Sequence, residues 1–91
     1  MNKHIELVKR YLAGEDVTTE ELRANSVDAR AAAHAGLYGD AAGTAAAEVA
    51  AAHAAKRAAD AAATTDNAHY WATADNAHYW VKQYEELTGD R

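Results

Sequence analysis

Residues 64–81 read TTDNAHYWATADNAHYWV, a nonamer written twice in succession. The two copies agree at seven of nine positions, and both contain the hexapeptide DNAHYW. Because an α-helix turns by about 100° per residue, a shift of nine residues corresponds to about two and a half turns. If this stretch is one helix, residues 69–71 therefore point to the opposite side from residues 78–80. A short chain buries one such side easily, whereas burying both requires a second surface.

The composition of the rest of the chain favours helix almost everywhere. Of 91 residues, 26 are Ala, none is Pro and only five are Gly. Ala loses no side-chain entropy in a helix and is the best helix former. We therefore predict a single all-α domain over residues 1–91, a compact array of three or four antiparallel helices packed tightly through Ala. Large apolar side chains are few, so a single chain forms only a small hydrophobic core. Because small domains with such cores are often stabilised by oligomerisation, we also predict a homo-oligomer.

Capping signals set the expected helix boundaries at 2–13, 19–37, 41–63 and 66–88. Thr18 and Glu21 form the sequence pattern of a capping box, and Gly14 and Gly89 are suited to end helices. Asn2 and Asp40 are candidate caps for the first and third helices. Residues 64–66 favour a break, because Thr and Asp prefer caps to helix interiors. One continuous helix through this point is the alternative.

Apolar spacing predicts which sides of the first and last helices face the core. In the first helix the stripe consists of Ile5, Val8, Tyr11 and Leu12. In the last helix the better candidate for the core is the side that carries Tyr70, Ala74, Ala77, Val81, Tyr84 and Thr88. A second side of the last helix carries Trp71, Asp75, His78, Lys82 and Glu85.

Charge and composition exclude several classes of function. With 14 acidic and nine basic side chains the net charge is −5, which argues against binding to duplex nucleic acid. No apolar run approaches the length that spans a bilayer, and the first residues do not resemble a signal peptide. The absence of Cys fits a reducing compartment. We expect a soluble, cytoplasmic protein.

The sequence gives no pattern for catalysis or for a metal centre. Ser26 is the only serine and lacks the glycine-flanked turn of a nucleophile. The pairs Asp66/His69 and Asp75/His78 have a spacing that could offer two metal ligands each, but the duplicates point apart on one helix. A hydrogen bond on the helix surface is the simpler interpretation of each pair. We expect no enzyme activity, no metal and no cofactor.

Binding of a small ligand is the function that the remaining residue types favour. Tyr and Trp rings can stack on a nucleobase, His and Asn can contact base edges, and Lys and Arg can hold phosphates. The candidate ligand-binding residues are Trp71, His78, Tyr79, Asp75, His69, Arg57 and Lys56. The alternative is that the aromatic rings only fill gaps in an Ala-rich core, which is the favoured interpretation for Tyr70, Trp80 and Tyr84.

The two ends of the chain carry a family resemblance. Residues 8–12 (VKRYL), 18–25 (TTEELRAN) and 79–89 (YWVKQYEELTG) flank an Ala-rich middle with spaced His, Tyr and Asp. Together they resemble small Ala-rich helical proteins of bacteriophage and bacterial genomes, and loosely resemble Ala-rich immunity proteins. The resemblance implies an accessory protein that counters host defence in the cytoplasm of the host cell. It assigns no functional residue.

These observations lead to one expected function and two alternatives. We expect a non-enzymatic, phage-type anti-defence protein that sequesters a small nucleotide immune signal in a pocket shared between subunits. The first alternative is a helical inhibitor or immunity-type protein that binds a host protein directly. The second is a purely structural or accessory oligomer.

Overall fold

Four helices make up the described part of the chain: α1 (Lys3–Leu12), α2 (Thr19–Gly39), α3 (Ala42–Ala63) and α4 (Asn67–Thr88). The structure, a computed structural model, describes the backbone of residues 3–39, 42–64 and 66–89, and the side chains of residues 3–34, 46–64 and 66–89. No strand occurs within these ranges. The predicted all-α fold of three or four helices is confirmed, and the described chain has four.

The capping signals at the start of the chain act as the sequence predicts. The Thr18 hydroxyl accepts a hydrogen bond from the Glu21 backbone N–H (3.1 Å), and the Glu21 carboxylate accepts one from the Thr18 N–H (3.2 Å). Gly14 follows α1 with φ 89°, a left-handed conformation that costs a residue with a Cβ more than it costs Gly. The candidate caps Asn2 and Asp40 lie outside the described residues.

The predicted break between the third and fourth helices is also confirmed. α3 ends at Ala63, and the Asp66 carboxylate accepts hydrogen bonds from the backbone N–H groups of Ala68 (3.0 Å) and His69 (3.3 Å). Gly89 ends α4 with φ 71°. Asp66 is therefore the N-cap of α4, and its carboxylate has a structural role because it binds backbone N–H groups, including that of His69.

The repeat offers a matched test of this cap. Replacing Asp66 by Ala removes both acceptor bonds and is expected to lower the free energy of unfolding by about 1 kcal/mol. Asp75 is the equivalent residue of the second copy but lies exposed inside α4, so Asp75→Ala is expected to change that free energy by less than about 0.5 kcal/mol. Urea denaturation of both variants measures the difference, and equal losses would show that the cap does not stabilise α4.

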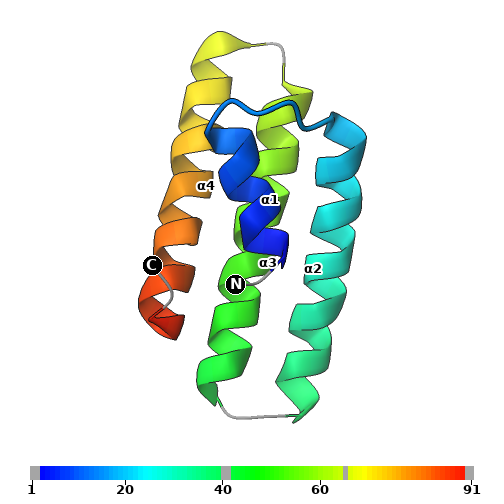
Figure 1. Cartoon of the computed structure of the whole chain (residues 1–91), viewed down its shortest axis with the longest axis vertical. Helices are drawn as coiled ribbons and strands as arrows, with labels where there is room; N and C mark the ends of the chain where they lie inside the picture. The colour runs from blue at the N-terminus through cyan, green and yellow to red at the C-terminus, as the bar shows by residue number, and fades with distance from the viewer. Residues whose placement is uncertain (1–2, 40–41, 65, 90–91) are drawn as a thin grey trace.

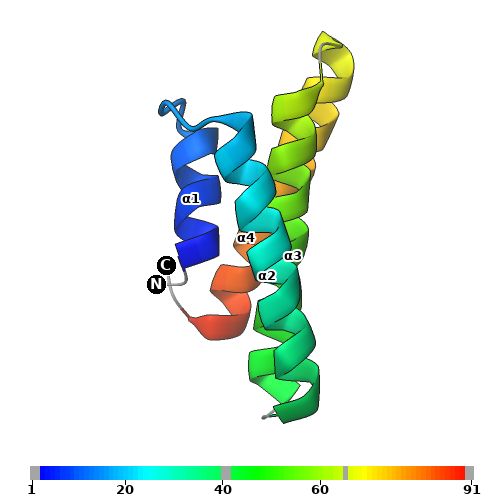
Figure 2. The same ribbon diagram turned by 90° about the vertical axis from the view of Figure 1, so that its right-hand side faces the viewer.

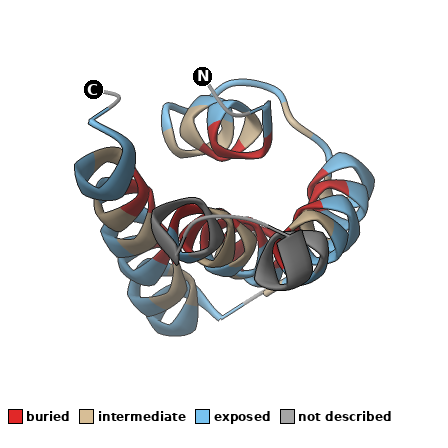
Figure 3. Cartoon of the chain, turned by 90° about the horizontal axis from the view of Figure 1, so that it is seen from below, coloured by how far each residue is buried: buried red, intermediate tan, exposed pale blue. Residues whose placement is uncertain are grey.

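Three of the helices form a layer, and the fourth packs on one side of it. α2, α3 and α4 run side by side with α3 in the middle, and α1 packs across one side of this layer (Figures 1 and 2). Figure 3 shows α1 on one side of the three longer helices and no helix of the described chain covering the other side. We call this uncovered side of the α2–α3–α4 layer the open face.

The core lies between α1 and the layer and consists mostly of Ala. Ile5, Val8 and Leu22 are the largest of the described side chains that are fully buried. Around them pack Ala side chains, chiefly of α3, together with Val81 and Tyr84 of α4. The small Ala side chains let the helix backbones approach closely, so that many dispersion contacts replace a few large side chains. Tyr11 and Leu12, predicted for the core stripe of α1, are partly buried against this cluster.

The predicted core side of α4 is largely confirmed. Ala74, Ala77, Val81 and Tyr84 are buried, and Tyr70 is partly buried. Thr88, at the end of this stripe, is exposed because it lies in the last turn of the helix. Its hydroxyl donates to the Tyr84 carbonyl at 2.9 Å.

The two copies of the repeat face opposite sides of α4, and the burial of their aromatic rings differs accordingly. Tyr70 is partly buried while the equivalent Tyr79 is 52% exposed. Trp71 is 60% exposed while the equivalent Trp80 packs against the core cluster. Each copy thus buries a different ring, as the nine-residue spacing requires on one helix.

No helix of the described chain has the length and apolar character needed to cross a lipid bilayer.

Candidate functional site

The seven candidate ligand-binding residues predicted from the sequence do not lie together in one site within a single chain. Trp71, Asp75 and His78 lie on one side of α4 and are exposed, as is Tyr79. Lys56 and Arg57 lie on α3, and His69 lies on a different side of α4 from Trp71. The structure brings Arg57 and His69 to the same groove and leaves the four residues of the first group outside it.

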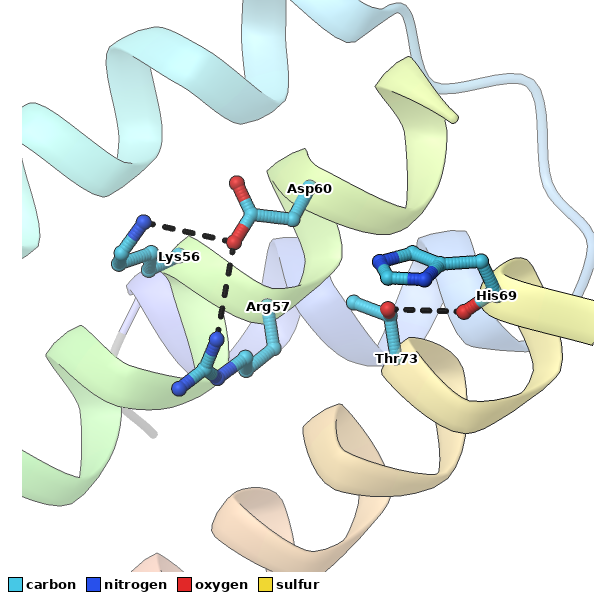
Figure 4. A network of polar contacts seen from close by, with 5 residues as sticks. All are labelled: Lys56, Arg57, Asp60, His69 and Thr73. Carbon is cyan, nitrogen blue, oxygen red and sulfur yellow. Dashed lines mark hydrogen bonds and ion pairs between the residues drawn. The ribbon is translucent and has the colours of Figure 1, made fainter. Parts of the chain in front are cut away.

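A polar cluster marks the middle of the open face. Asp60 lies between two cations of its own helix, with its Oδ2 3.4 Å from the Lys56 Nζ and 3.8 Å from an Arg57 guanidinium nitrogen. On the neighbouring α4, the Thr73 hydroxyl donates to the His69 carbonyl at 2.9 Å (Figure 4). Arg57, His69 and Thr73 together line a shallow groove of about 280 Å³ between α3 and α4.

A larger groove lies on the other side of α3, between α3 and α2, with a volume of about 560 Å³. Its α2 wall carries Arg23 and Arg30, which are seven residues apart and so share one side of the helix. Lys56 and His53 line its α3 wall. The hollow exists because the residues at its base, such as Ala52 and Ala59, have no side chain beyond Cβ. Val27, 68% exposed, adds an apolar patch at the rim.

An aromatic stack connects α3 and α4 beside the α2–α3 groove. The rings of His53 on α3 and Trp80 on α4 lie with centroids 4.4 Å apart and planes 25° from parallel. Trp80 also contacts Tyr79 edge-on, with centroids 5.1 Å apart. The sequence interpretation of Trp80 as a gap-filling residue agrees with its partial burial, but the same ring also holds His53 in place beside the α2–α3 groove.

The charges that line these two grooves are mostly positive. Arg23, Arg30, Lys56 and Arg57 face a single carboxylate, Asp60, among the described lining residues. These four side chains are four of the nine Lys and Arg residues in a chain of net charge −5. The lining of the two grooves therefore has the opposite sign from the chain as a whole, which attracts anions to it.

The grooves on the α1 side have mixed charge. The α1–α2 groove, about 530 Å³, is lined by Lys3 and Arg10 but also by Glu6, Glu21 and Asp28. The α1–α4 groove, about 540 Å³, contains His78 and Lys82, and its Lys9 is bound to Glu85 at 2.5 Å. Neither groove concentrates positive charge as the open face does.

Sequence reasoning missed part of this arrangement. Arg23 and Arg30 were recognisable as cations suited to phosphate, but nothing in the sequence indicated that they share a groove with Lys56. His53 carried no signal of its own, because the stack with Trp80 depends on how α3 packs against α4. Within the described residues, no three His, Asp or Glu side chains lie close enough to share a metal ion.

Two titratable groups at the α1 side have shifted pKa values. Burial raises the pKa of Tyr11 to about 12, and a hydrogen bond with the Tyr70 side chain adds to this effect. Burial also lowers the pKa of His4 below its usual 6.5, and the nearby Lys3 charge lowers it further. Neither group lines the open face, so we relate both pKa shifts to the stability of the fold and not to ligand binding.

The His4 shift predicts a loss of stability in mild acid. The unfolded chain binds a proton at His4 below about pH 6.5, whereas the folded chain binds it only at a lower pH. Above about pH 6.5 His4 is neutral in both states and costs no stability. As the pH is lowered from there through the folded pKa, the free energy of unfolding decreases. Urea denaturation at about pH 7.5 and about pH 5.5 is expected to show this loss. His4→Gln is expected to reduce it, while replacing the exposed His69 by Gln is expected to leave it unchanged. An unchanged pH slope in His4→Gln would contradict the assignment.

Comparison of the chain with protein-family models, with curated proteins and with solved structures finds no match. The resemblance to phage and immunity proteins stays a prediction.

Proposed function

We propose that this protein is a non-enzymatic binding protein that captures a small nucleotide-type ligand on its open face. The observation that carries the proposal is the concentration of four cations along two adjoining grooves of an acidic chain. Phosphate groups are the anions that such side chains bind best, because Arg and Lys form charge-assisted hydrogen bonds with phosphate oxygens.

The aromatic stack supports a ligand that also carries a base. His53 lies on the groove wall next to Lys56, and its ring is backed by Trp80. A flat ring held at the edge of a cationic groove can stack with a nucleobase, an interaction that contributes about 1–3 kcal/mol per base. A nucleotide or dinucleotide thus matches both features, whereas inorganic phosphate matches only the first.

Capture without reaction is the expected outcome of this arrangement. The side chains lining the two grooves hold and orient an anion, and we assign none of them the role of nucleophile or general base. In the setting that the resemblance implies, such capture would sequester a small nucleotide signal of host immunity. Because the grooves are shallow and open, a second subunit that closes over them would strengthen binding, in line with the shared pocket expected from the sequence.

A thermal-shift titration with a cyclic dinucleotide tests the proposal. At a ligand concentration about 100 times the Kd, binding stabilises the folded chain by about 2.7 kcal/mol, which raises the Tm of a domain of this size by about 10–20 °C. Chromatography of the ligand released by heating should return it intact. A panel of cyclic and linear dinucleotides that leaves the Tm unchanged at millimolar concentration would contradict the proposal, and a chemically altered ligand would contradict its non-enzymatic part.

A second candidate function, direct binding to another protein, is favoured by the exposed aromatic rings of α4. Trp71 and Tyr79 are more than half exposed, and Trp and Tyr are the side chains that most often dominate protein interfaces. A protein inhibitor would leave its Tm unchanged in nucleotide solutions and would co-purify with a host protein.

A further inference from the structure

The outer surface of α4 is the side that faces away from α3, and it consists of Ala68, Trp71, Ala72, Asp75, Tyr79, Lys82 and Glu86. All seven are exposed. α4 forms one edge of the layer (Figure 3), and within the described chain this surface borders other helices only through Ala72, in the α3–α4 groove, and Lys82, in the α1–α4 groove. Positions 68, 72, 75, 79, 82 and 86 repeat at intervals of four and three, which is the spacing of residues that line a helix–helix contact.

The charges on this surface are arranged to complement a second copy of themselves. Asp75 and Lys82 lie at equal distances along the sequence from the midpoint between His78 and Tyr79. Trp71 and Glu86 are related in the same way about that midpoint. Turning one α4 helix end for end about this point therefore places Asp75 of one copy against Lys82 of the other, and each contact occurs twice.

We propose that the outer surface of α4 binds a second copy of this chain, with the two α4 helices antiparallel about a two-fold axis near residues 78–79. In this arrangement two Asp75–Lys82 ion pairs form across the interface, and Trp71 of each copy packs on the last turns of the other α4. Ala68 and Ala72 leave room for this approach because they carry no side chain beyond Cβ. A parallel arrangement would instead place Asp75 against Asp75 and Lys82 against Lys82, which repel.

The amount of exposed aromatic surface supports a partner of this kind. Trp71 is 60% exposed and Tyr79 is 52% exposed. The equivalent rings of the other copy, Trp80 and Tyr70, are partly buried inside the chain. α4 is 22 residues long and so spans about 33 Å, enough for both ion pairs and both Trp contacts to form along one helix pair. Of the residues on this surface only Ala72 also lines an open-face groove, and none of the four groove cations takes part in the dimer, so the ligand contacts and the dimer contacts can be tested separately.

Charge exchange tests this interface directly. Sedimentation velocity of the purified chain over about 1–200 µM is expected to show a monomer–dimer equilibrium, with Trp71 becoming less accessible to acrylamide as the dimer forms. Asp75→Lys alone and Lys82→Asp alone each place like charges opposite one another, and we expect each to weaken the dimer by about tenfold or more. The double variant Asp75→Lys/Lys82→Asp restores opposite charges and is expected to dimerise like the parent chain.

Mixing the two single variants gives a second, sharper readout. The Asp75→Lys chain then presents two Lys residues to the two Asp residues of the Lys82→Asp chain, so a heterodimer is expected where each variant alone is mostly monomeric. Asp28→Lys serves as the matched control, because Asp28 is exposed and lines the α1–α2 groove, and α2 forms the opposite edge of the layer from α4 (Figure 1). It is expected to leave the dimer unchanged.

Three outcomes would overturn the proposal. The first is a monomer throughout the concentration range with Trp71 fully accessible. The second is a dimer whose Kd ignores the single charge reversals, which would place the interface elsewhere. The third is a chain that stays monomeric alone and associates through Trp71 only with a different protein.

Discussion

Replacing Leu22 by Ala is expected to lower the free energy of unfolding by about 2–5 kcal/mol, the largest effect of a single substitution that we predict for stability. Leu22 is fully buried and belongs to the same core cluster as Ile5 and Val8 of α1. The surrounding side chains are mostly Ala, which cannot extend into a cavity, so little of the lost packing can be recovered. A domain of this size has only a few kcal/mol to lose, so the variant should be largely unfolded at 37 °C.

Val27→Ala is the matched control for this prediction. Val27 lies on the same helix and also loses methyl groups, but it is 68% exposed. We expect its free energy of unfolding to change by less than about 0.5 kcal/mol, because no buried contact is removed. Urea denaturation followed by circular dichroism gives both values. Similar losses in the two variants would show that the core does not lie between α1 and the layer.

Reversing two charges in the α2–α3 groove is expected to reduce nucleotide binding by about a hundredfold. Arg30 and Lys56 stand on opposite walls of this groove, and a hydrogen bond to a charged group contributes about 1.5–3 kcal/mol. In Arg30→Glu/Lys56→Glu both attractive contacts become repulsive, so the thermal shift with a cyclic dinucleotide should disappear. Circular dichroism checks that the variant still folds, since Lys56 also pairs with Asp60.

The control for the groove variant has the same total charge. Lys3→Glu/Arg10→Glu makes an identical change in net charge in the α1–α2 groove, on the other side of the layer. It is expected to keep the ligand-induced thermal shift, apart from a small long-range effect that salt screens. If both double variants lost binding equally, the net charge of the chain and not the open face would be responsible.

Local signals in the sequence were enough to place the helix ends. The capping box at Thr18 and Glu21, the cap at Asp66 and the stops at Gly14 and Gly89 all work through neighbouring backbone groups, so they act wherever the helix packs. The opposite burial of the two repeat copies followed from helix geometry in the same way. Trp71 and Trp80 are nine residues apart, and no packing choice on a single helix can bury both on one side.

The candidate site depended on packing that the sequence does not encode locally. The sequence predicts seven ligand-binding residues, of which Lys56, Arg57 and His69 line the two open-face grooves. Trp71, Asp75, His78 and Tyr79 lie outside both grooves on other sides of α4. Most residues of α3 are Ala, so its sequence shows no apolar stripe that tells which side meets α2, α1 or α4. The positions of Arg23, Arg30 and His53 relative to Lys56 could not be deduced for this reason.

The sequence by itself determined the helical content, the ends of the helices and the opposition of the two repeat copies, because all three depend on interactions within a few residues or on the regular turn of one helix. The tertiary structure alone decided that α1 covers one side of the layer and leaves the other open. That choice rests on a few large side chains, Ile5, Val8 and Leu22, which can be buried together only when α1 lies across α2 and α3. A cover on the open face would instead take the charges of Lys56, Arg57 and Asp60 out of water, which is unfavourable.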